Sequence, residues 1–442
     1  MKNKGNSHFS RRKFLGTGLL GAAGLSVLPQ VGRAEDAANS AVKGDSSIIR
    51  LGFIGVGRQA IGLLNGFMSL PGIEVVAGSD VYGIKRERFL RRTRDYYAKN
   101  NKDVKVEVYE NYRDLLQRED IDAVVIASPD HWHALMAIDA CKAGKDIYLE
   151  KPLTFTIKEG QELIKAVRAN NIVLATGSMQ RSYSNFQHAV KMVQKGKIGR
   201  IQKIYAHAGE PPKPFDLPKQ ELPKDLNWDL WVGPLNANIH FNHDLNPPIS
   251  LDPIENEKVW GAWRWYKETG GGYTTDWGAH MFDIAQWAIG MDRRGPSEII
   301  PAGYEGAEFL TFKYDNGVIM TEQPYDDKNS RGCKFFGTEG WIEVSRGQYN
   351  ASDPALFPEG EISGNNGAHY VDFIDSVKKR KDPIAPVEVG HSTCVTCTLG
   401  NIAYHLGRPL KWDPDKEVFI NDEEASKQLH REYRKGYTLS WK

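Results

Sequence analysis

Short, nearly continuous apolar runs alternate with helical spacings through the first part of the chain. The runs lie at residues 48–54, 73–79, 104–108, 121–127, 146–149 and 172–177. Runs of this kind are typical of parallel strands that are buried on both faces. The segments between them place apolar residues on one helical face, as in Ile61, Leu64 and Met68. The pattern predicts an α/β domain over residues 48–177 in which parallel strands alternate with helices.

After residue 177 the pattern changes to an alternation of apolar and polar residues, which predicts strands with one buried face. Such strands are predicted at residues 201–208, 308–314, 318–323, 333–337 and 341–344. We expect a C-terminal α+β domain over residues 178–388, followed by a helix (389–406) and a tail within segment 389–442 that packs back on the first domain. Residues 209–260 are irregular and rich in Pro and Asn, which is typical of a functional loop or lid.

The first 34 residues have the pattern of an export signal. Ser10-Arg11-Arg12-Lys13-Phe14-Leu15 precedes an apolar run that ends at Leu28, and small residues follow around Ala34. This arrangement resembles a twin-arginine signal peptide. The run is too short and too rich in Gly and Ala for a stable membrane span. We expect residues 1–34 to be a signal peptide, residues 35–47 to be a linker, and the protein to be periplasmic or secreted.

Charge and cysteine content narrow the classes of partner. A chain of 442 residues is long enough for two domains. Its 57 Lys and Arg against 56 Asp and Glu leave a net charge of +1, which gives no support for a nucleic-acid or membrane-surface partner. Of the four cysteines only Cys394 and Cys397 have CxxC spacing. Because a second pair is missing, we expect buried thiols and no metal site.

A glycine-rich turn follows the first predicted strand. Gly55 and Gly57 belong to a GxGxxA sequence, and Arg58 and Gln59 open the next helix. The first glycine permits a tight turn, and the second lets the backbone approach a pyrophosphate at the helix N-terminus. The second strand ends at Asp80, an acid that binds ribose hydroxyls and disfavours a 2′-phosphate. These residues predict a Rossmann domain that binds NAD, although Lys85 and Arg86 nearby leave NADP open.

Further polar residues follow the later strands of the same predicted sheet. The carboxyl ends of parallel strands meet at one edge, where ligands bind. The cofactor contacts expected there are Ser128, Asp130, His131, His133, Glu150, Lys151 and Gln180. For the two histidines a role at the start of a helix is equally open.

Three residues from two distant segments have the chemistry of a proton relay. Lys151 stands between a predicted strand and a proline, and Asp276 and His280 are four residues apart, on one face if that segment is helical. A lysine, an imidazole and a carboxylate can remove a proton from a hydroxyl group. Arg264 and Tyr273 precede the pair in an aromatic segment that could bind sugar. Arg181 could contact ligand or form a surface ion pair.

Together these motifs resemble the glucose–fructose oxidoreductase and inositol dehydrogenase (Gfo/Idh/MocA) family over about residues 48–410. The resemblance implies a Rossmann domain and a C-terminal domain with an open, mostly antiparallel sheet that often forms oligomers. It implies oxidation or reduction of sugars and related polyols with NAD(P). Lys151, Asp276 and His280 match the family's catalytic positions, and Asp283 matches a position near the substrate.

The residues and the resemblance leave three interpretations. The main expectation is an oxidoreductase that acts on a sugar or glycoside hydroxyl with tightly bound NAD(P), because a cofactor lost outside the cytoplasm could not be replaced. The first alternative is a redox-neutral glycoside hydrolase or lyase that works through a keto-sugar. A glycosidase branch of the family holds NAD tightly, but Lys151 favours a dehydrogenase site. The second alternative is a non-catalytic module that holds NAD.

Overall fold

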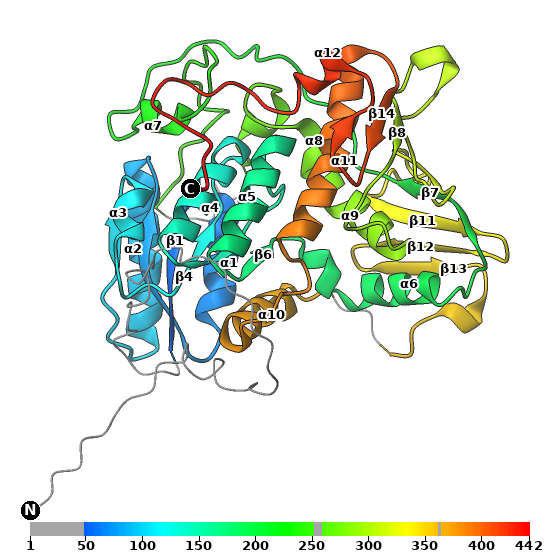
Figure 1. Ribbon diagram of the computed structural model, residues 1–442. Coiled ribbons are helices and arrows are strands. Elements are labelled where there is room, and N and C mark those ends of the chain that lie inside the picture. The colour runs from blue at the N-terminus through cyan, green and yellow to red at the C-terminus, as the bar shows by residue number, and fades with distance from the viewer. Residues whose placement is uncertain (1–47, 252–258, 361–363) are drawn as a thin grey trace, which may run out of the picture. The chain divides into compact units, whose positions relative to one another are not determined.

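The first half of the protein is a six-stranded parallel sheet with the strand order β3-β2-β1-β4-β5-β6. The computed structural model describes residues 48–251, 259–360 and 364–442 (Figure 1). The predicted signal peptide and linker lie outside the described residues. The strands are β1 (Ile49–Ile54), β2 (Ile73–Ser79), β3 (Glu107–Tyr109), β4 (Ala123–Ile126), β5 (Asp146–Leu149) and β6 (Leu174–Thr176). This order places a ligand crevice at the carboxyl ends of β1 and β4, where the direction of winding reverses.

Helices connect these strands. They are α1 (Arg58–Met68), α2 (Gly83–Lys99), α3 (Tyr112–Leu116), α4 (Asp130–Lys142) and α5 (Ile157–Ala169). Helix α1 begins directly after Gly57 and buries Leu63, Leu64 and Phe67. Helix α5 begins with a capping box, in which Thr156 and Glu159 satisfy each other's backbone N–H groups. The predicted Rossmann architecture is thereby confirmed.

The second half is built on a nine-stranded sheet with the order β13-β12-β11-β7-β10-β9-β8-β14-β15. Its strands are β7 (Ile201–Ala206), β8 (Glu298–Ile300), β9 (Thr311–Lys313), β10 (Ile319–Thr321), β11 (Gly332–Gly337), β12 (Trp341–Ser345), β13 (Gln348–Ala351), β14 (Leu410–Asp413) and β15 (Val418–Phe419). Only the pair β7 and β10 is parallel. The mostly antiparallel sheet is therefore confirmed, and the fold is α/β with two distinct sheets.

Helices pack against one face of the second sheet. The helices of this half are α6 (Ser184–Gln194), α7 (Trp228–Val232), α8 (Gly272–Asp276), α9 (Gly278–Ala288), α10 (Asn366–Lys379), α11 (Val387–Leu406) and α12 (Glu423–Ser426). Helices α6, α9 and α11 contact the strands, and their core includes Phe282, Phe312 and Phe335. None of the helices that the structure describes is long and apolar enough to cross a membrane.

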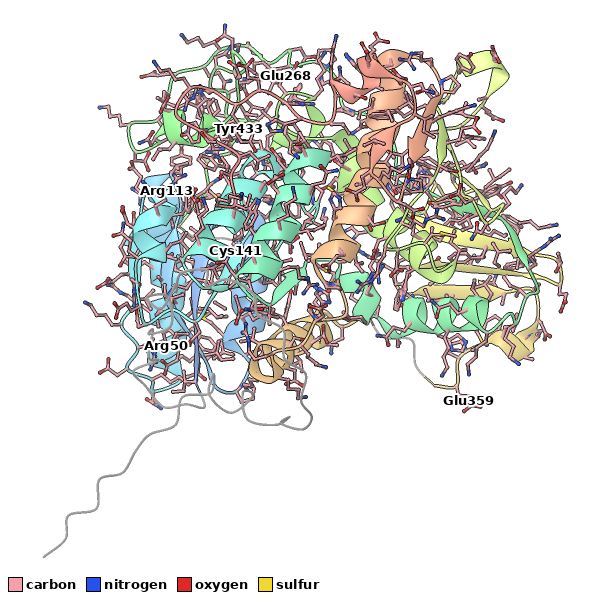
Figure 2. The ribbon with its side chains drawn as sticks, in the orientation of Figure 1. Arg50, Arg113, Cys141, Glu268, Glu359 and Tyr433 are labelled. Atoms are coloured by element: carbon pink, nitrogen blue, oxygen red, sulfur yellow. The ribbon has the colours of Figure 1, made fainter. Side chains whose placement is uncertain are left out.

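Three segments from the end of the chain interlock the two halves in Figure 1. Helix α10 packs on the Rossmann core, where the ring of Tyr370 lies 4.8 Å from that of Phe67. Helix α11 contacts both α5 and α9. The tail crosses α5, where Tyr433 donates a hydrogen bond of 2.6 Å to Glu159 (Figure 2). Strands β14 and β15 extend the second sheet instead. Of the segment 389–442, which is predicted to pack back on the first domain, α11 and the tail contact that domain.

Candidate active site

A pocket lies at the carboxyl ends of β1, β2 and β4, where the dinucleotide is predicted to bind. It has an empty volume of about 1000 Å³, and the predicted cofactor residues that line it are Gly55, Gly57, Arg58, Gln59, Asp80 and Ser128. Gly55 has φ +78°, and a Cβ atom there would stand 2.7 Å from the backbone nitrogen of Ser128. A side chain at position 55 would therefore strain the backbone and would collide with the turn that follows β4.

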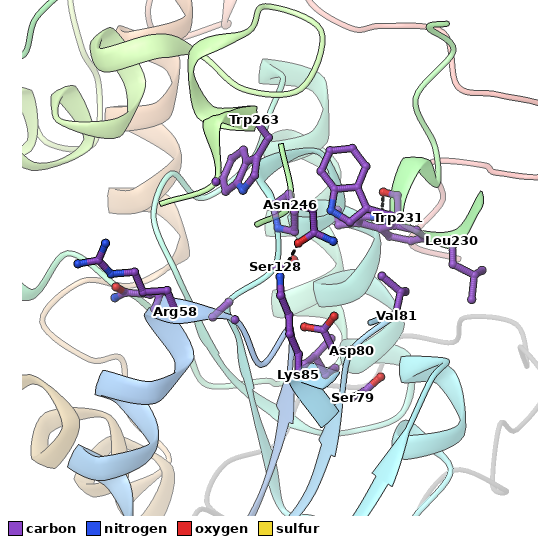
Figure 3. A pocket seen from close by; sticks show the side chains of 18 of the residues that line it. Arg58, Ser79, Asp80, Val81, Lys85, Ser128, Leu230, Trp231, Asn246 and Trp263 are labelled. Atoms are coloured by element: carbon purple, nitrogen blue, oxygen red, sulfur yellow. Dashed lines mark hydrogen bonds between the residues drawn. The ribbon is translucent and has the colours of Figure 1, made fainter. Parts of the chain in front are cut away.

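The opposite wall of the pocket comes from the second half of the chain. Figure 3 shows Trp231, Asn246 and Trp263 facing Asp80 and Lys85 across the pocket. The buried ammonium of Lys85 donates a hydrogen bond to Oδ1 of Asn246 and so ties helix α2 to the covering segment. Part of the irregular region predicted over residues 209–260 thus covers the pocket; residues 252–258 lie outside the described residues.

Asp80 is held in a fixed orientation by the backbone. Its Oδ2 accepts from the N–H of Val56 and its Oδ1 from the N–H of Tyr82, both at 3.0 Å. Arg86 donates to the backbone carbonyl of Asp80 at 2.6 Å. Burial lowers the pKa of Lys85, and the negative charge of Asp80 partly opposes this shift. The ribose end of the pocket therefore carries one carboxylate with basic groups close to it.

Several buried polar atoms have no hydrogen-bond partner among the described residues. They are the Oγ atom of Ser128, the Nδ2 atom of Asn246, and both amide atoms of Gln180. Buried polar atoms are nearly always hydrogen-bonded, so these groups fit a ligand with many donors and acceptors. Ser128 and Asn246 line the pocket together with the glycine turn and fit a dinucleotide there, whereas Gln180 is not among the lining residues.

Lys151 and Asp276 form an ion pair between the two halves of the chain. The Nζ atom of Lys151 lies 2.7 Å from Oδ1 of Asp276 and 2.9 Å from its backbone carbonyl oxygen. Arg264 adds a second cation, its Nε atom 3.6 Å from the same Oδ1. Burial alone would raise the pKa of Asp276, but Lys151 and Arg264 hold that pKa below its ordinary value. The carboxylate is therefore ionised and positions the ammonium.

Asp276 and His280 do not share one continuous helix, which corrects the prediction. Helix α8 ends at Asp276, and α9 begins at Gly278. The N–H groups of His280 and Met281 both donate to the carbonyl of Trp277 at 2.9 Å, which tightens the chain at this point. A Cβ atom at Gly278 would stand 2.9 Å from Sγ of Cys397, so the break coincides with close packing against α11.

His280 is buried and neutral. Its side chain is almost completely buried, and its Nδ1 atom has no hydrogen-bond partner among the described residues. Burial, followed by the charges of Lys151 and Arg346, places the pKa of His280 well below its ordinary value. A neutral imidazole with an unpartnered nitrogen can accept a proton.

Glu150 lies beside this cluster but points toward the cofactor side. Gln59 donates a hydrogen bond of 2.8 Å to Oε1 of Glu150, and a Cβ atom at Gly177 would meet the carboxyl group at 3.0 Å. Burial raises the pKa of Glu150, whereas Lys151 lowers it. Glu150 therefore links the glycine turn to the turn after β6.

Both halves of the chain match the models of one protein family. Residues 49–178 match the NAD-binding Rossmann fold of the GFO_IDH_MocA oxidoreductase family, and residues 213–439 match the C-terminal alpha/beta domain of that family. The chain belongs to the Gfo/Idh/MocA oxidoreductase family. The family implies an enzyme whose Rossmann domain binds NAD(P).

Curated relatives of this Gfo/Idh/MocA protein carry glycosidase names. A "Glycosyl hydrolase family 109 protein" from Shewanella baltica strain OS155 is 30% identical over 210 residues, or 45% of this chain and 43% of that relative. An "Alpha-N-acetylgalactosaminidase" from Shewanella oneidensis is 29% identical over 206 residues, with the same coverage. The matches span less than half the length of these relatives.

Solved structures share the fold over most of the chain. The myo-inositol 2-dehydrogenase from Lactobacillus plantarum has a TM-score of 0.55 at 19% identity and covers 82% of this chain and 99% of that one. The aldose-aldose oxidoreductase from Caulobacter crescentus has a TM-score of 0.55 at 16% identity, with 82% and 99% covered. At these identities the likeness shows the fold alone.

Two of the substrate contacts predicted for this family member are paired with each other. Arg181 and Asp283 are fully buried, and the Nη2 atom of Arg181 lies 2.7 Å from Oδ1 of Asp283. Asp292 and Thr393 complete the network. Arg181 is thus in a buried ion pair, so the surface ion pair left open from the sequence is wrong. Substrate contact by either residue stays a prediction.

The predicted contacts at the start of α4 lie outside the dinucleotide pocket. The helix begins at Asp130, and Pro129 before it has the extended conformation of an N-cap. His133 lies between the carbonyl oxygens of Ser128 and Pro152, at 2.9 and 2.7 Å, and His131 lies 2.9 Å from that of Trp231. Both histidines therefore hold backbone turns, and cofactor contact stays a prediction.

Asp130 faces a second cavity with an empty volume of about 1530 Å³. Burial raises the pKa of Asp130 to about 8. The walls of this cavity include Gly271, Thr275 and Asn401, so the cavity borders helix α8. Contact between Asp130 and the cofactor stays a prediction.

An aromatic surface lies beside the catalytic candidates, and sugar contact by Arg264 and Tyr273 stays a prediction. Tyr273 stacks on Trp265 at 4.1 Å, and Arg264 packs 4.2 Å from the ring of Trp263. Sequence reasoning missed Arg331 and Arg346, which lie against the same aromatic cluster. Arg346-Gly347 is recognisable as a turn after a predicted strand, but no local sequence pattern places this turn near Trp277.

The cysteines are buried and free, and no group of three or more potential metal-binding side chains occurs among the described residues.

Proposed function

We propose that this Gfo/Idh/MocA protein is a redox-neutral glycoside hydrolase or lyase that works through a keto-sugar with resident NAD. The observation that carries the proposal is a dinucleotide pocket covered by the second half of the chain beside the Lys151–Asp276–His280 set. The glycosidase names of the curated relatives support the same choice. In a redox-neutral cycle the cofactor is oxidised again at the end of each turnover, so the protein can work without releasing it.

The residues divide the chemistry as follows. Gly55, Gly57 and Asp80 hold the dinucleotide, and Gln180 offers its free amide to it. NAD bound by these residues would supply hydride transfer from and back to the carbon that carries the reacting hydroxyl. His280 takes the hydroxyl proton, and Lys151, oriented by Asp276, stabilises the oxygen as its charge changes.

The ketone makes the elimination possible. A carbonyl acidifies the neighbouring C–H, so that proton is lost and the bond from the next carbon to the glycosidic oxygen breaks. The leaving alcohol takes up a proton. Water then adds to the enone in a hydrolase, whereas in a lyase the enone takes back the hydride and leaves as an unsaturated sugar with its hydroxyl restored. Return of the hydride restores the hydroxyl, and no net oxidation results.

The experiment uses the purified protein without added nucleotide. Denaturation should release about one nucleotide per chain, identified as NAD by mass. Incubation with nitrophenyl glycosides should release many equivalents of nitrophenol with no lasting reduced-nicotinamide absorbance. In deuterated water the product should carry deuterium at the carbon next to the oxidised position. Hydrolysis without deuterium incorporation would rule out the keto-sugar route.

The second candidate is net oxidation of a sugar, and the intact Lys151–Asp276 pair favours it. This candidate predicts that a glycoside raises the reduced-nicotinamide absorbance by one equivalent and then stalls until a second, reducible sugar is supplied. The two candidates therefore differ in the absorbance that persists after substrate addition.

Export and assembly are also proposals. The twin-arginine pattern over residues 1–34 supports transport of the folded protein to the periplasm or beyond, which requires the cofactor to be bound first. Helices cover one face of the second sheet, and Tyr205, Lys334, Phe336 and Trp341 lie on the other. We propose that this face joins copies of the chain. Light scattering of the wild type and of Phe336→Glu tests this, and an unchanged mass would count against it.

A further inference from the structure

Two arginines stand on the aromatic surface beside His280. The guanidinium carbon of Arg346 lies 4.8 Å from the ring centre of Trp277, and that of Arg331 lies 5.8 Å from the same ring. Trp277 directly follows Asp276, and its ring centre is 5.8 Å from that of His280. A sugar bound beside Trp277 and its two arginines would therefore have both the proton acceptor and a guanidinium within reach.

The two arginines differ in their partners. Arg331 contacts Nε2 of His207, whose Nδ1 lies 3.1 Å from Oε1 of Glu322. Arg331 therefore belongs to a chain of polar groups that ends in a carboxylate. For Arg346, no hydrogen bond or ion pair with another described residue is found. Most other cations of this region are matched, since Lys151 and Arg264 face Asp276, and Arg181 faces Asp283.

The backbone holds Arg346 in a defined place. It stands at the turn between β12 and β13, where Gly347 has φ +76°. The side-chain amide of Asn185 donates to the carbonyl oxygens of Ser345 and Gln348, at 2.6 and 3.2 Å, on either side of the turn. Arg346 is solvent-exposed, yet its surroundings desolvate the charge enough to lower its pKa, with Tyr183, Asp276 and Glu150 opposing the shift. An accessible and partly desolvated guanidinium suits ligand binding.

We propose that Arg346 is a specificity residue that binds an anionic substituent, a carboxylate or a sulfate, on the sugar that the site oxidises. This inference rests on the proposed function, because it names the substrate class of the same site. A planar guanidinium matches two oxygens of a carboxylate or sulfate in a bidentate arrangement. A neutral sugar would leave that guanidinium without a direct ion-pair partner, since Asp276 and Glu150 act on it only through longer-range charge interactions.

The kinetic test compares the holoenzyme with three variants. The substrates are nitrophenyl glucuronide, nitrophenyl glucoside 6-sulfate and the matching neutral glucoside, each as both anomers. The wild type should prefer one anionic substrate, and Arg346→Gln should lower kcat/KM for it by about 10–100-fold, as expected for a lost charge-assisted hydrogen bond. The neutral glucoside should lose much less, because Arg346 acts on it only through the pKa of His280. Arg346→Lys should recover part of the loss because it keeps the charge without the fork.

Arg293→Gln is the matched control, since Arg293 is an exposed arginine after α9, and it should behave as the wild type. The carboxylate and sulfate substrates distinguish the two anions. Equal losses on neutral and anionic substrates in Arg346→Gln would overturn the inference, as would a wild-type preference for the neutral glucoside.

Binding without turnover separates this inference from the proposed function. Calorimetry of the holoenzyme with glucuronate, glucose 6-sulfate and glucose should show Arg346-dependent binding of one anionic sugar. If that binding occurs but no glycoside is cleaved, the inference stands and the proposed function fails. If neutral glycosides are cleaved and Arg346→Gln changes neither binding nor selectivity, the proposed function stands and the inference fails.

Discussion

At the scale of single residues, burial decides which groups of the site are charged. His280 is enclosed beside two cations, so the neutral imidazole is favoured. Asp276 is also enclosed, but two cations face it and keep it ionised. The same cluster therefore contains a neutral proton acceptor and a fixed cation, and each is needed for removal of a hydroxyl proton.

The first prediction concerns this proton transfer. Lys151→Ala and His280→Ala should each lower kcat by roughly 10²–10⁴-fold, the range for positioned acid–base groups. Nucleotide occupancy after purification should stay nearly unchanged, since neither side chain lines the dinucleotide pocket. Lys142→Ala, at an exposed lysine, serves as the control. Full activity in both variants would contradict the assigned roles.

The second prediction concerns the choice of cofactor. Asp80→Ser removes an acid that disfavours a 2′-phosphate, so the ratio of NADP to NAD affinity should rise by about tenfold or more. The basic groups of Lys85 and Arg86 remain to contact the phosphate. Calorimetry on nucleotide-free protein measures both affinities. Glu119→Gln, at an exposed acid, should leave the ratio unchanged, and an unchanged ratio in Asp80→Ser would speak against the prediction.

At the scale of elements, segments from the second half complete a pocket that begins in the first. The turn after β1 supplies the glycines, whereas Trp231 lies on α7, Trp263 lies on the 3₁₀ helix Ala262–Trp265, and Asn246 lies in the irregular segment between them. The tail supports this cover, because Arg434 binds Asp229 on α7 and Tyr437 packs 5.6 Å from Trp132. Cofactor retention is therefore a property of several elements.

The third prediction tests that cover. Asn246→Ala removes the partner of the buried Lys85 ammonium and should speed release of the nucleotide by about tenfold or more, since a buried charge would lose its hydrogen bond. Release is followed after dilution by separating protein from free nucleotide at intervals and assaying the nucleotide by mass. Asn236→Ala, at an exposed position of the same segment, is the control. Equal release rates in all three proteins would show that the cover does not retain the cofactor.

At the scale of the whole molecule, the two sheets enclose ionisable groups that titrate abnormally. Burial lowers the pKa values of His131 and His133 to about 4 and raises that of Asp130 to about 8. These three residues lie in the first turn of α4, where the covering segments and the second half exclude water. As the pH falls, the two histidines lower the free energy of unfolding, whereas Asp130 raises it.

The fourth prediction follows from the histidines. Their folded pKa values lie below the unfolded value of about 6.5, so the unfolded chain binds more protons between pH 6.5 and 4. The free energy of unfolding should therefore fall as the pH drops through that window, by on the order of 3 kcal/mol for each histidine. Urea unfolding at several pH values measures the slope. Because Asp130 acts in the opposite direction, the slope is compared in the Asp130→Asn variant, and a free energy of that variant that is constant between pH 7 and 4.5 would contradict the prediction.

The fifth prediction isolates Asp130. Its folded pKa lies above the unfolded value, so the carboxyl group costs stability progressively as the pH rises from about 4 to 8. Asp130→Asn removes that cost, and the variant should be more stable than the wild type at pH 8 but not at pH 4. A variant that is equally destabilised at both pH values would show that packing, rather than ionisation, dominates at this position.

The sequence by itself determined the features that depend on neighbouring residues. Nearly continuous apolar runs predict the parallel strands, since a strand buried on both faces has few polar positions. The glycine turn, Asp80 and Lys151 follow directly from the ends of those strands, so their common edge could be predicted. The residues of the second sheet alternate as antiparallel strands do, although their ends shifted by a few residues.

Only the tertiary structure decided the features that join distant segments. Pairing of Arg181 with Asp283, of Lys85 with Asn246, and the approach of Arg346 to Trp277 all span 69 to 161 positions. Such contacts depend on the path of the whole chain, which no local pattern encodes. The break between α8 and α9 also depends on packing against α11. For the same reason, the charge state of His280 is set by which cations the fold brings around it, rather than by its neighbours in sequence.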